Sequence, residues 1–219
     1  MNIINLFKRY KHAWVFLYIF IYLPWFLYLE RNVTTDFHLI HTTLDNYIPF
    51  VEFFIIPYTL WFLFIALTIG FFFFTNTKDF YRLILFLFSG MTLFLIISTI
   101  YPNGLDLRPV TFARDNIFVD MVKTLYKTDT ATNVLPSIHV FNSIGAQIAI
   151  SHSETLKKYR VIQYGSFILT SLIILSTMFL KQHSIIDVVV AGVMALILYQ
   201  LVYSQRLHKE LEFSQQITM

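Results

Sequence analysis

Long apolar runs, separated by short polar segments, account for most of the chain. The six longest runs cover residues 13–29, 58–74, 80–100, 135–150, 159–180 and 185–203. A membrane-spanning helix needs about 20 mainly apolar residues, and each run is close to that length. The pattern therefore predicts an all-α, polytopic membrane protein with six transmembrane helices in one bundle.

The segments that flank the first two apolar runs indicate where the predicted spans begin and end. A short basic segment precedes the first run, as in a signal peptide, but the run is long and aromatic and no small-residue cleavage site follows, so we expect a retained span. Before the second run, Pro49, Glu52 and Pro57 interrupt the apolar pattern. A lipid-facing Glu52 would be costly, so we expect an interfacial turn there. Residues 101–133 form the longest polar region and are too rich in charge to cross the membrane.

Composition agrees with a membrane location. Hydrophobic residues make up 57% of the chain and charged residues 13%, against roughly 25% charged residues in soluble proteins. At 219 residues we expect a single membrane-embedded domain over residues 1–219. The absence of cysteine excludes disulfides, thiolate nucleophiles and zinc–thiolate sites. The net charge of +3 is spread over short loops, so we expect no nucleic-acid partner.

The distribution of positive charge predicts the orientation. With a cytoplasmic N-terminus, ten Lys and Arg residues fall on the cytoplasmic side and six on the other side. The cytoplasmic residues are Lys8, Arg9, Lys11, Lys78, Arg82, Lys157, Lys158, Arg160, Arg206 and Lys209. Because cytoplasmic loops carry the excess of Lys and Arg, both termini are expected in the cytoplasm. The usage of Phe, Ile and Lys suggests a bacterial cytoplasmic membrane.

Three ionisable residues stand out where the last two apolar runs meet, namely Lys181, His183 and Asp187. Such groups at membrane depth are costly unless they are paired, so they indicate a functional site. If one helix carries both, the Asp187 carboxylate can reach the His183 ring four residues away, which makes the other ring nitrogen a better base or nucleophile. The alternative is a capping box, in which Ser184 and Asp187 only satisfy backbone donors at a helix start.

The six-span topology brings distant polar residues to one membrane face. The third and fifth runs end, and the fourth and sixth runs begin, on the non-cytoplasmic side. The residues that we expect to meet there are Arg108, His139, Lys181, His183 and Asp187. A candidate active site is therefore expected at the outer membrane–water interface.

These side chains suit a phosphoryl group held without a metal. Arg offers bidentate donors to phosphate and Lys a compact charge. One histidine would attack phosphorus and the other would protonate the departing oxygen, while backbone amides around residues 137–139 would add donors. We expect no metal and no cofactor, and we interpret His38 and His41 as solvated loop residues. Lipid headgroups lie at this depth, so a lipid phosphate or phospholipid is the expected substrate.

Three blocks of the sequence resemble the type 2 phosphatidic acid phosphatase superfamily. They are Arg108-Pro109, then Pro136-Ser137-Ile138-His139, then Ser176 followed by His183 and Asp187. The resemblance covers the third to sixth runs, with the blocks within residues 101–192. It implies that His183 is the nucleophile, Asp187 its partner and His139 the acid toward the leaving group. It also implies that Arg108 and the amides near Ser137 hold the phosphate.

The chain departs from the family pattern at three positions. Tyr101 stands where the first block normally has Lys, Ile138 where the second usually has Gly, and Thr177 where the third usually has Arg. Two phosphate-binding cations are thus missing, and Lys181 is a candidate replacement for one of them. The combination of Pro-Ser-Ile-His with Lys181-Gln182-His183 is similar to the branch that contains inositol phosphorylceramide synthases, which transfers headgroups between lipids.

The resemblance therefore implies a metal-independent lipid-phosphate phosphatase or a lipid headgroup phosphotransferase acting through a phosphohistidine. Two alternatives remain open. One is a transporter or scaffold in which the polar residues form a relay or a structural network, and the other is a family member that binds lipid phosphate without turnover. We assign no role to His12, His152 and His208, which lie in segments expected in the cytoplasm.

Overall fold

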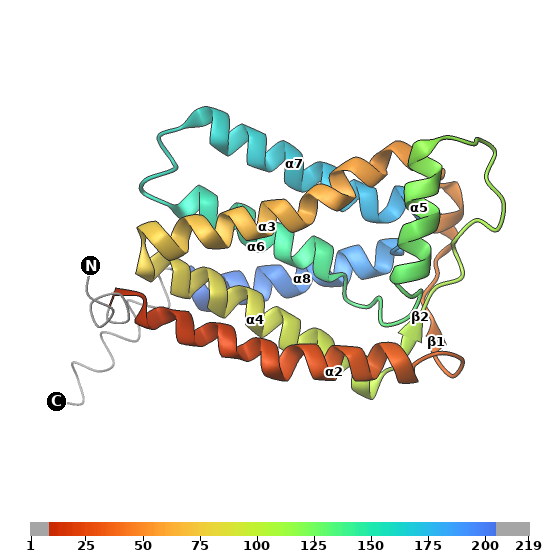
Figure 1. The fold of residues 1–219 in the computed structure, drawn as a ribbon, viewed down its shortest axis with the longest axis horizontal. Helices are drawn as coiled ribbons and strands as arrows, with labels where there is room; N and C mark the ends of the chain where they lie inside the picture. Colours follow the sequence, from red (N-terminus) through yellow and green to blue (C-terminus); the bar gives the residue numbers. More distant parts are fainter. Residues whose placement is uncertain (1–8, 205–219) are drawn as a thin grey trace.

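Most of the chain folds into helices that run side by side along one long axis (Figure 1). The structure is a computed structural model, and it describes residues 9–204. The α-helices of this part are α2 (Ile19–Asn32), α3 (Ile55–Thr75), α4 (Thr77–Ile100), α5 (Ile117–Thr128), α6 (Ile138–His152), α7 (Arg160–Phe179) and α8 (Ile185–Val202). Three 3₁₀ helices and two short strands complete it: η1 (Lys11–Tyr18), η2 (Thr43–Tyr47), η3 (Glu52–Phe54), β1 (His38–Leu39) and β2 (Asn103–Gly104). Lys8, Arg206, His208 and Lys209, considered above, lie outside the described residues.

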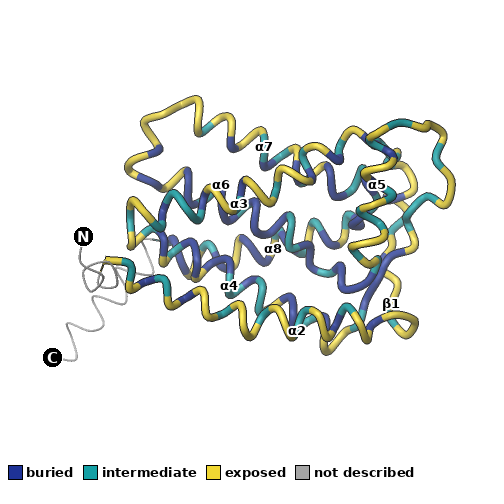
Figure 2. The backbone as a smooth tube through the Cα atoms, in the orientation of Figure 1, coloured by how far each residue is buried: buried dark blue, intermediate teal, exposed yellow. Residues whose placement is uncertain are grey.

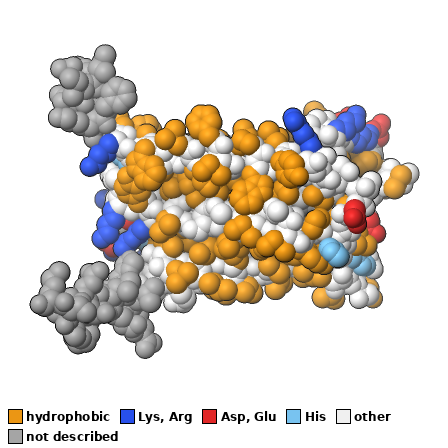
Figure 3. All heavy atoms as spheres, turned by 90° about the horizontal axis from the view of Figure 1, so that it is seen from below, with side chains coloured by type: hydrophobic (Ala, Val, Ile, Leu, Met, Phe, Trp, Pro, Cys, Tyr) orange, Lys and Arg blue, Asp and Glu red, His pale blue; other side chains and the backbone are white. Residues whose placement is uncertain are grey.

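Five helical segments are long and apolar enough to cross a membrane. They are Lys11–Asn32, Glu52–Thr75, Thr77–Ile100, Arg160–Phe179 and Ile185–Val202, and they match the first, second, third, fifth and sixth predicted spans. Hydrophobic side chains cover the middle of the molecule, and charged side chains gather at its two ends (Figure 3). The chain is thus a mostly helical, multi-pass membrane protein.

The fourth predicted span forms the shorter helix α6, which has 15 residues, so the count of six spans is not confirmed. Helix α6 lies in the middle of the bundle and packs against α3, α4, α7 and α8. Most residues of α6 are buried or half-buried, whereas α2 is largely exposed (Figure 2). A helix surrounded by other helices does not face lipid, which explains why α6 tolerates the buried polar residues Asn142 and Ser143.

Close packing of α6 against α4 depends on two glycines. A Cβ atom at Gly90 would lie 1.9 Å from the ring of Phe141, and one at Gly145 would lie 2.7 Å from the ring of Phe86. The two phenylalanines stack with ring centroids 4.7 Å apart. Small residues let the helices approach, as is usual where helices associate in membranes. This contact fixes the position of α6 and of the residues at its start.

The connections at the end of the bundle opposite the 151–159 turn are tied together. Strands β1 and β2 pair in parallel, with His38 opposite Asn103 and Leu39 opposite Gly104. The Asn103 side chain also accepts hydrogen bonds from the backbone N–H groups of Val134 and Leu135. Helix α5 stands across this end of the bundle (Figure 1). The long polar region therefore forms a folded cap beside the start of α6.

Glu52 lies in the turn expected before the second span. It is buried in η3 and accepts hydrogen bonds from Arg114 Nη1 at 3.0 Å and Asn116 Nδ2 at 3.1 Å. The same Asn116 side chain caps α5 by accepting from the N–H groups of Phe118 and Val119. A paired carboxylate avoids the cost of an isolated charge, and the pair joins the cap to the start of α3.

Candidate active site

His183 and Asp187 meet at the start of α8. The distance from His183 Nδ1 to Asp187 Oδ2 is 3.3 Å, and both residues are buried. Asp187 Oδ2 also accepts from the Ser184 N–H at 2.9 Å, and Ser184 Oγ accepts from the Ile186 N–H. The capping box and the His–Asp pair, which the sequence left as alternatives, are thus present together. With Nδ1 bound to the carboxylate, Nε2 of His183 is the nitrogen left for chemistry.

The turn that carries His183 is held from two sides. Lys181, which has a positive φ of 55°, donates through Nζ to the carbonyls of Asp45 and Ile48 at 2.8 and 2.5 Å. The buried Asp45 carboxylate accepts from Ser184 Oγ at 2.7 Å. The Thr177 carbonyl accepts from the N–H groups of residues 182 and 183. These hydrogen bonds fix the backbone on both sides of His183 and so orient its imidazole.

His139 comes from a second helix start. Ser137 is the N-cap of α6, and its side chain accepts from the Val140 N–H at 3.4 Å. The Ser137 N–H donates to the carbonyl of Asp187 at 3.4 Å, which joins the beginnings of α6 and α8. This contact places His139, in the first turn of α6, beside the turn that carries His183.

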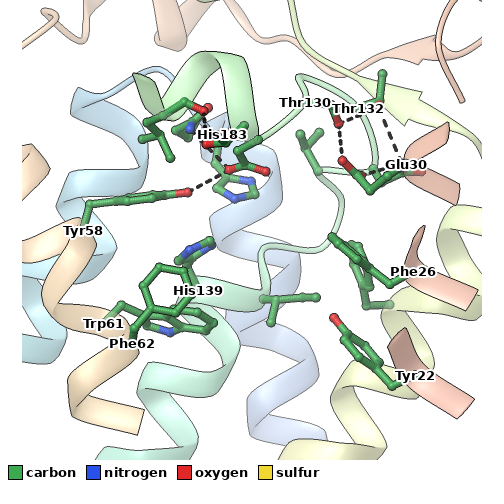
Figure 4. A pocket seen from close by; sticks show the side chains of 18 residues that line it. Tyr22, Phe26, Glu30, Tyr58, Trp61, Phe62, Thr130, Thr132, His139 and His183 are labelled. Carbon is green, nitrogen blue, oxygen red and sulfur yellow. Dashed lines mark hydrogen bonds between the residues drawn. The ribbon is translucent and has the colours of Figure 1, made fainter. Parts of the chain in front are cut away.

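The His139 ring lies among aromatic rings and close to His183. Its centroid is 4.5 Å from that of Tyr58, 4.3 Å from that of Trp61 and 6.1 Å from that of His183. His139 Nε2 is buried and has no hydrogen-bond partner among the described residues. The imidazoles of His139, on α6, and His183, in the turn before α8, therefore lie close together beside aromatic side chains (Figure 4).

Both histidines line a cavity of about 420 Å³. Its walls come from α2, α3, the end of α5, the segment before α6 and the α7–α8 turn. Tyr58, Trp61 and Phe62 lie on one side of His139, and Tyr22, Phe26 and Glu30 lie on the other (Figure 4). The lining combines aromatic rings with a group of polar side chains that includes Asp129 and Gln182, and this combination suits an amphipathic ligand.

Arg108 lies behind the wall of this cavity and does not line it. Its Nη1 donates to the carbonyls of Tyr126 and Asp129 at 3.3 and 2.9 Å, and its Nη2 donates to the carbonyl of Thr130 at 2.8 Å and to Gln182 Oε1. The guanidinium also lies 4.6 Å from the centroid of the Tyr126 ring. In this arrangement Arg108 fixes the loop that forms the cavity wall.

Gln182 and Asp129 stand between Arg108 and the cavity, and both line it. Asp129 Oδ2 accepts from the Tyr58 hydroxyl at 3.1 Å, and Gln182 Nε2 lies 3.4 Å from the same oxygen. Burial raises the pKa of the Asp129 carboxyl above its usual value, although His183 and Arg108 act in the opposite direction. Burial also lowers the pKa of the Arg108 guanidinium, against the effect of Asp129. Burial therefore disfavours the charged form of the Asp129 carboxyl group.

The structure brings together some of the predicted site residues and not others. His139, His183 and Asp187 form one cluster, with Arg108 behind it. Lys181 points to the η2 connection, where burial lowers its pKa against the effect of Asp45, and Ser137 serves as a helix cap. Neither of these two lines the cavity. The structure thus gives Lys181 no contact with the cavity that would replace a missing phosphate-binding cation.

Of the three positions that depart from the pattern of the resembled family, Tyr101 and Thr177 do not line the cavity, whereas Ile138 does. Tyr101 stacks on His38 with ring centroids 4.2 Å apart. Thr177 is buried, and its hydroxyl donates to the carbonyl of Ile174 at 2.8 Å. Tyr101 and Thr177 thus have structural contacts of their own and supply no positive charge.

Sequence reasoning missed four residues that shape the site, namely Glu30, Asp45, Asp129 and Gln182. Glu30, Asp129 and Gln182 line the cavity, and Asp45 holds the start of α8. Glu30 and Asp129 lie at the ends of helical segments. Acidic residues are common at such positions, so the sequence contained no specific indication of a site there. The only hint for Gln182 was its place directly before His183.

Comparison of the chain with protein-family models, with curated proteins and with solved structures finds no match.

Proposed function

We propose that this chain is a metal-independent lipid-phosphate phosphatase or lipid headgroup phosphotransferase that works through a phosphohistidine. We further propose that it belongs to the type 2 phosphatidic acid phosphatase superfamily, near the inositol phosphorylceramide synthase-like branch. The observation that carries the proposal is the pairing of His183 with Asp187 at 3.3 Å, next to the His139 ring at 6.1 Å, in one cavity. These are the groups that a nucleophile, its orienting partner and a proton donor require.

In the first half of the reaction, His183 Nε2 attacks phosphorus while Asp187 holds the Nδ1 proton. The bond from phosphorus to the leaving oxygen breaks, and that oxygen takes a proton from His139. His139 must be protonated for this step, and the bound phosphate supplies the counter-charge. The faces of Tyr58 and Trp61, with ring centroids 4.5 and 4.3 Å from that of His139, would offset part of the cost of a buried imidazolium.

In the second half, His139 is neutral and accepts a proton from the acceptor. The acceptor oxygen attacks the phosphorus on His183, and the bond from phosphorus to nitrogen breaks, which restores both imidazoles. Water as the acceptor gives hydrolysis, and a lipid alcohol gives headgroup transfer. The same two histidines serve both outcomes because acid and base roles reverse between the two halves.

For the membrane, we propose six crossings, with α6 as the inner sixth helix. Both termini would be cytoplasmic and the cavity would open near the non-cytoplasmic interface of a bacterial cytoplasmic membrane. Support comes from the five long apolar helices and from the excess of Lys and Arg in the loops assigned to the cytoplasm. The headgroup of a lipid in the outer leaflet would then reach His183 while its acyl chains stay in the bilayer.

The test uses the purified full chain in detergent with a panel of phospholipids and excess chelator. We expect headgroup release or exchange that persists with chelator, together with an acid-labile phosphoryl adduct on His183 after rapid quenching. His183→Asn should abolish both signals, whereas His152→Asn, on a helix end far along the chain from the site, should keep both. Turnover by a folded His183→Asn protein would refute the assignment of the nucleophile.

A second candidate is a protein of the same fold that binds lipid phosphate without turnover. It is favoured by the engagement of both terminal nitrogens of Arg108 with backbone carbonyls and Gln182, which leaves them no donor for phosphate in this conformation. Binding and turnover measured on the same lipids separate the two candidates. Saturable binding without any product would favour the second.

A further inference from the structure

Acidic and aromatic residues, but no Lys or Arg among the described residues, line the cavity that holds the two histidines. Glu30 and Asp129 are the acidic residues of this lining. Arg108 lies behind the wall with Nη1 and Nη2 bonded to carbonyl oxygens. A phosphomonoester headgroup with two negative charges would therefore face the Glu30 carboxylate and the Asp129 carboxyl group without a direct cationic contact. Such an arrangement opposes the binding of a dianion.

One side of the cavity is a stripe on α2. Tyr22, Phe26 and Glu30 are spaced four residues apart, so they share one face of the helix, and all three line the cavity (Figure 4). The rings of Tyr22 and Phe26 stack with centroids 5.8 Å apart and an interplanar angle of 12°. Aromatic faces beside a carboxylate are the groups that bind ammonium ions in proteins.

Two hydrogen bonds hold the Glu30 carboxylate in place, and its oxygens can accept further donors. One oxygen accepts from Thr130 Oγ1 at 2.6 Å, and the other accepts from Asn133 Nδ2 at 2.9 Å. A carboxylate has about four lone-pair sites, so each oxygen can accept one more donor. Asp129, which also lines the cavity, adds a second carboxyl group. A cation in the cavity would interact favourably with both groups.

We propose that the donor substrate is a phosphodiester lipid with a positively charged amine headgroup. The ammonium group lies between Glu30 and the faces of Tyr22 and Phe26, and the phosphorus lies beside His183. This inference rests on the function proposed above. His183 Nε2 forms a bond to phosphorus, the bond from phosphorus to the diacylglycerol oxygen breaks, and that oxygen takes its proton from His139. The phosphorylated amino alcohol stays on His183 until water or an alcohol removes it.

The experiment compares four lipids with identical acyl chains, all of which yield diacylglycerol. They are phosphatidylcholine, phosphatidylethanolamine, phosphatidylglycerol and phosphatidic acid. We expect one or both of the amine lipids to be turned over at least tenfold faster than the other two. Glu30→Gln should lower kcat/KM for the amine lipids about tenfold and leave phosphatidylglycerol unchanged. Asp36→Asn, an exposed acid in the connection after α2, is the matched control and should change neither.

Glu30 also bonds Thr130 and Asn133, so Glu30→Gln could impair folding. A second variant therefore tests the aromatic part of the proposed ammonium site without changing Glu30. Phe26→Leu keeps the Glu30 contacts and removes one aromatic face, and it should reduce the preference for amine lipids at least threefold. Equal or faster turnover of phosphatidic acid or phosphatidylglycerol overturns the inference while leaving the proposed function intact. An unchanged preference in both variants overturns it as well.

Absence of turnover on all four lipids would count against the proposed function, and binding then decides the inference separately. Dihexanoyl phosphatidylcholine and dihexanoyl phosphatidic acid are titrated against the full chain in detergent, and the fluorescence of its tryptophans, including Trp61 in the cavity wall, is followed. At least tenfold tighter binding of the phosphatidylcholine, lost in Glu30→Gln, supports the inference. Equal or tighter binding of the phosphatidic acid overturns it.

Discussion

Asp45 and Ser184 are 139 positions apart in the sequence, yet the Asp45 Oδ2 atom accepts a hydrogen bond from Ser184 Oγ at 2.7 Å. The other Asp45 oxygen accepts from the Ile185 N–H at 2.9 Å. The start of α8 is thus capped by a carboxylate from the connection between α2 and α3, in addition to its own capping box. A carboxylate at a helix N-terminus is favourable in both hydrogen bonding and electrostatics. Since His183 directly precedes Ser184, this contact orients the candidate nucleophile.

Removal of this cap should therefore affect both stability and activity. Asp45→Ala breaks the two hydrogen bonds to the start of α8, and we expect a loss of about 3 kcal/mol in the free energy of unfolding, since bonds to charged groups contribute about 1.5–3 kcal/mol each. We also expect kcat to fall at least tenfold with little change in KM, because Asp45 does not line the cavity. Thermal unfolding in detergent and lipid turnover are the two measurements.

The control for this variant is a change in the same connection. Asp36 is exposed, and Asp36→Ala should leave both the melting temperature and kcat unchanged. Asp45→Asn keeps one acceptor oxygen and should fall between the wild type and Asp45→Ala in both measurements. A full kcat in a stably folded Asp45→Ala protein would show that the cap does not orient His183.

The proposed role of His139 as a proton donor predicts a dependence on the leaving group. His139→Ala should slow release of an alkyl alcohol such as diacylglycerol by about 10²–10⁴-fold, the usual contribution of general acid–base catalysis. A nitrophenyl leaving group needs no proton, so the first step with a nitrophenyl phosphodiester should slow by less than about tenfold. Burst-phase release of nitrophenol measures this step. An equal loss for both substrates would indicate that His139 has a different role.

Arg108 should behave as a residue that holds the loop rather than as a simple positive charge. Its guanidinium bonds three backbone carbonyls within residues 126–130, and a Lys side chain lacks the planar fork needed to reach them together. We therefore expect Arg108→Lys to be nearly as damaging as Arg108→Ala, with faster amide hydrogen exchange over residues 126–133 in both variants. Near-normal activity and exchange in Arg108→Lys would instead point to a charge that acts directly on phosphate.

The raised pKa of Asp129 predicts an effect of pH on stability. In the folded protein Asp129 holds its proton to a higher pH than in the unfolded chain, whose pKa is near the usual value of 3.8. Between about pH 4 and the raised pKa, the folded state binds more protons, so stability falls as pH rises. The melting temperature of the wild type should therefore drop, relative to Asp129→Asn, as pH is raised through this window. Asp106→Asn, at an exposed loop position, should show no such divergence.

The five long apolar helices could be predicted from the sequence because lipid imposes a length and an apolar pattern on each span. Helix α5, within the polar region 101–133, was not predicted. Predicted boundaries for the third span, residues 80–100, and for helix α4, Thr77–Ile100, differ by three residues at one end. The exception is α6, whose 15 residues leave it outside the five helices long enough to cross a membrane, and which buries the polar residues Asn142 and Ser143. The central position of α6 depends on its packing against α3, α4, α7 and α8. The length of an apolar run does not specify such packing.

The candidate site could be predicted only in part. His183 and Asp187 are only four positions apart, so the sequence was sufficient to predict that pair, although His183 lies in the turn before α8 and not on the helix itself. The roles of Lys181 and Arg108 were expected from charge alone, but both side chains bond to backbone carbonyls that come from other segments. Long-range contacts of this kind depend on the tertiary fold, and nothing in the local pattern around either residue specifies them.

The close contact between α4 and α6 gives a test of the fold that is independent of function. Gly90→Ala would place a Cβ 1.9 Å from the Phe141 ring, and we expect a loss of about 1–3 kcal/mol, as for other overpacked cores. Gly70→Ala on α3 has no heavy atom within 4 Å of the new Cβ, so it should be neutral or slightly stabilising because Ala favours the helix over Gly. Thermal unfolding of both variants in one detergent provides the comparison. A lower melting temperature of Gly90→Ala than of Gly70→Ala is expected only if Gly90 faces α6. If Gly90 faced lipid instead, the two variants would have the same melting temperature.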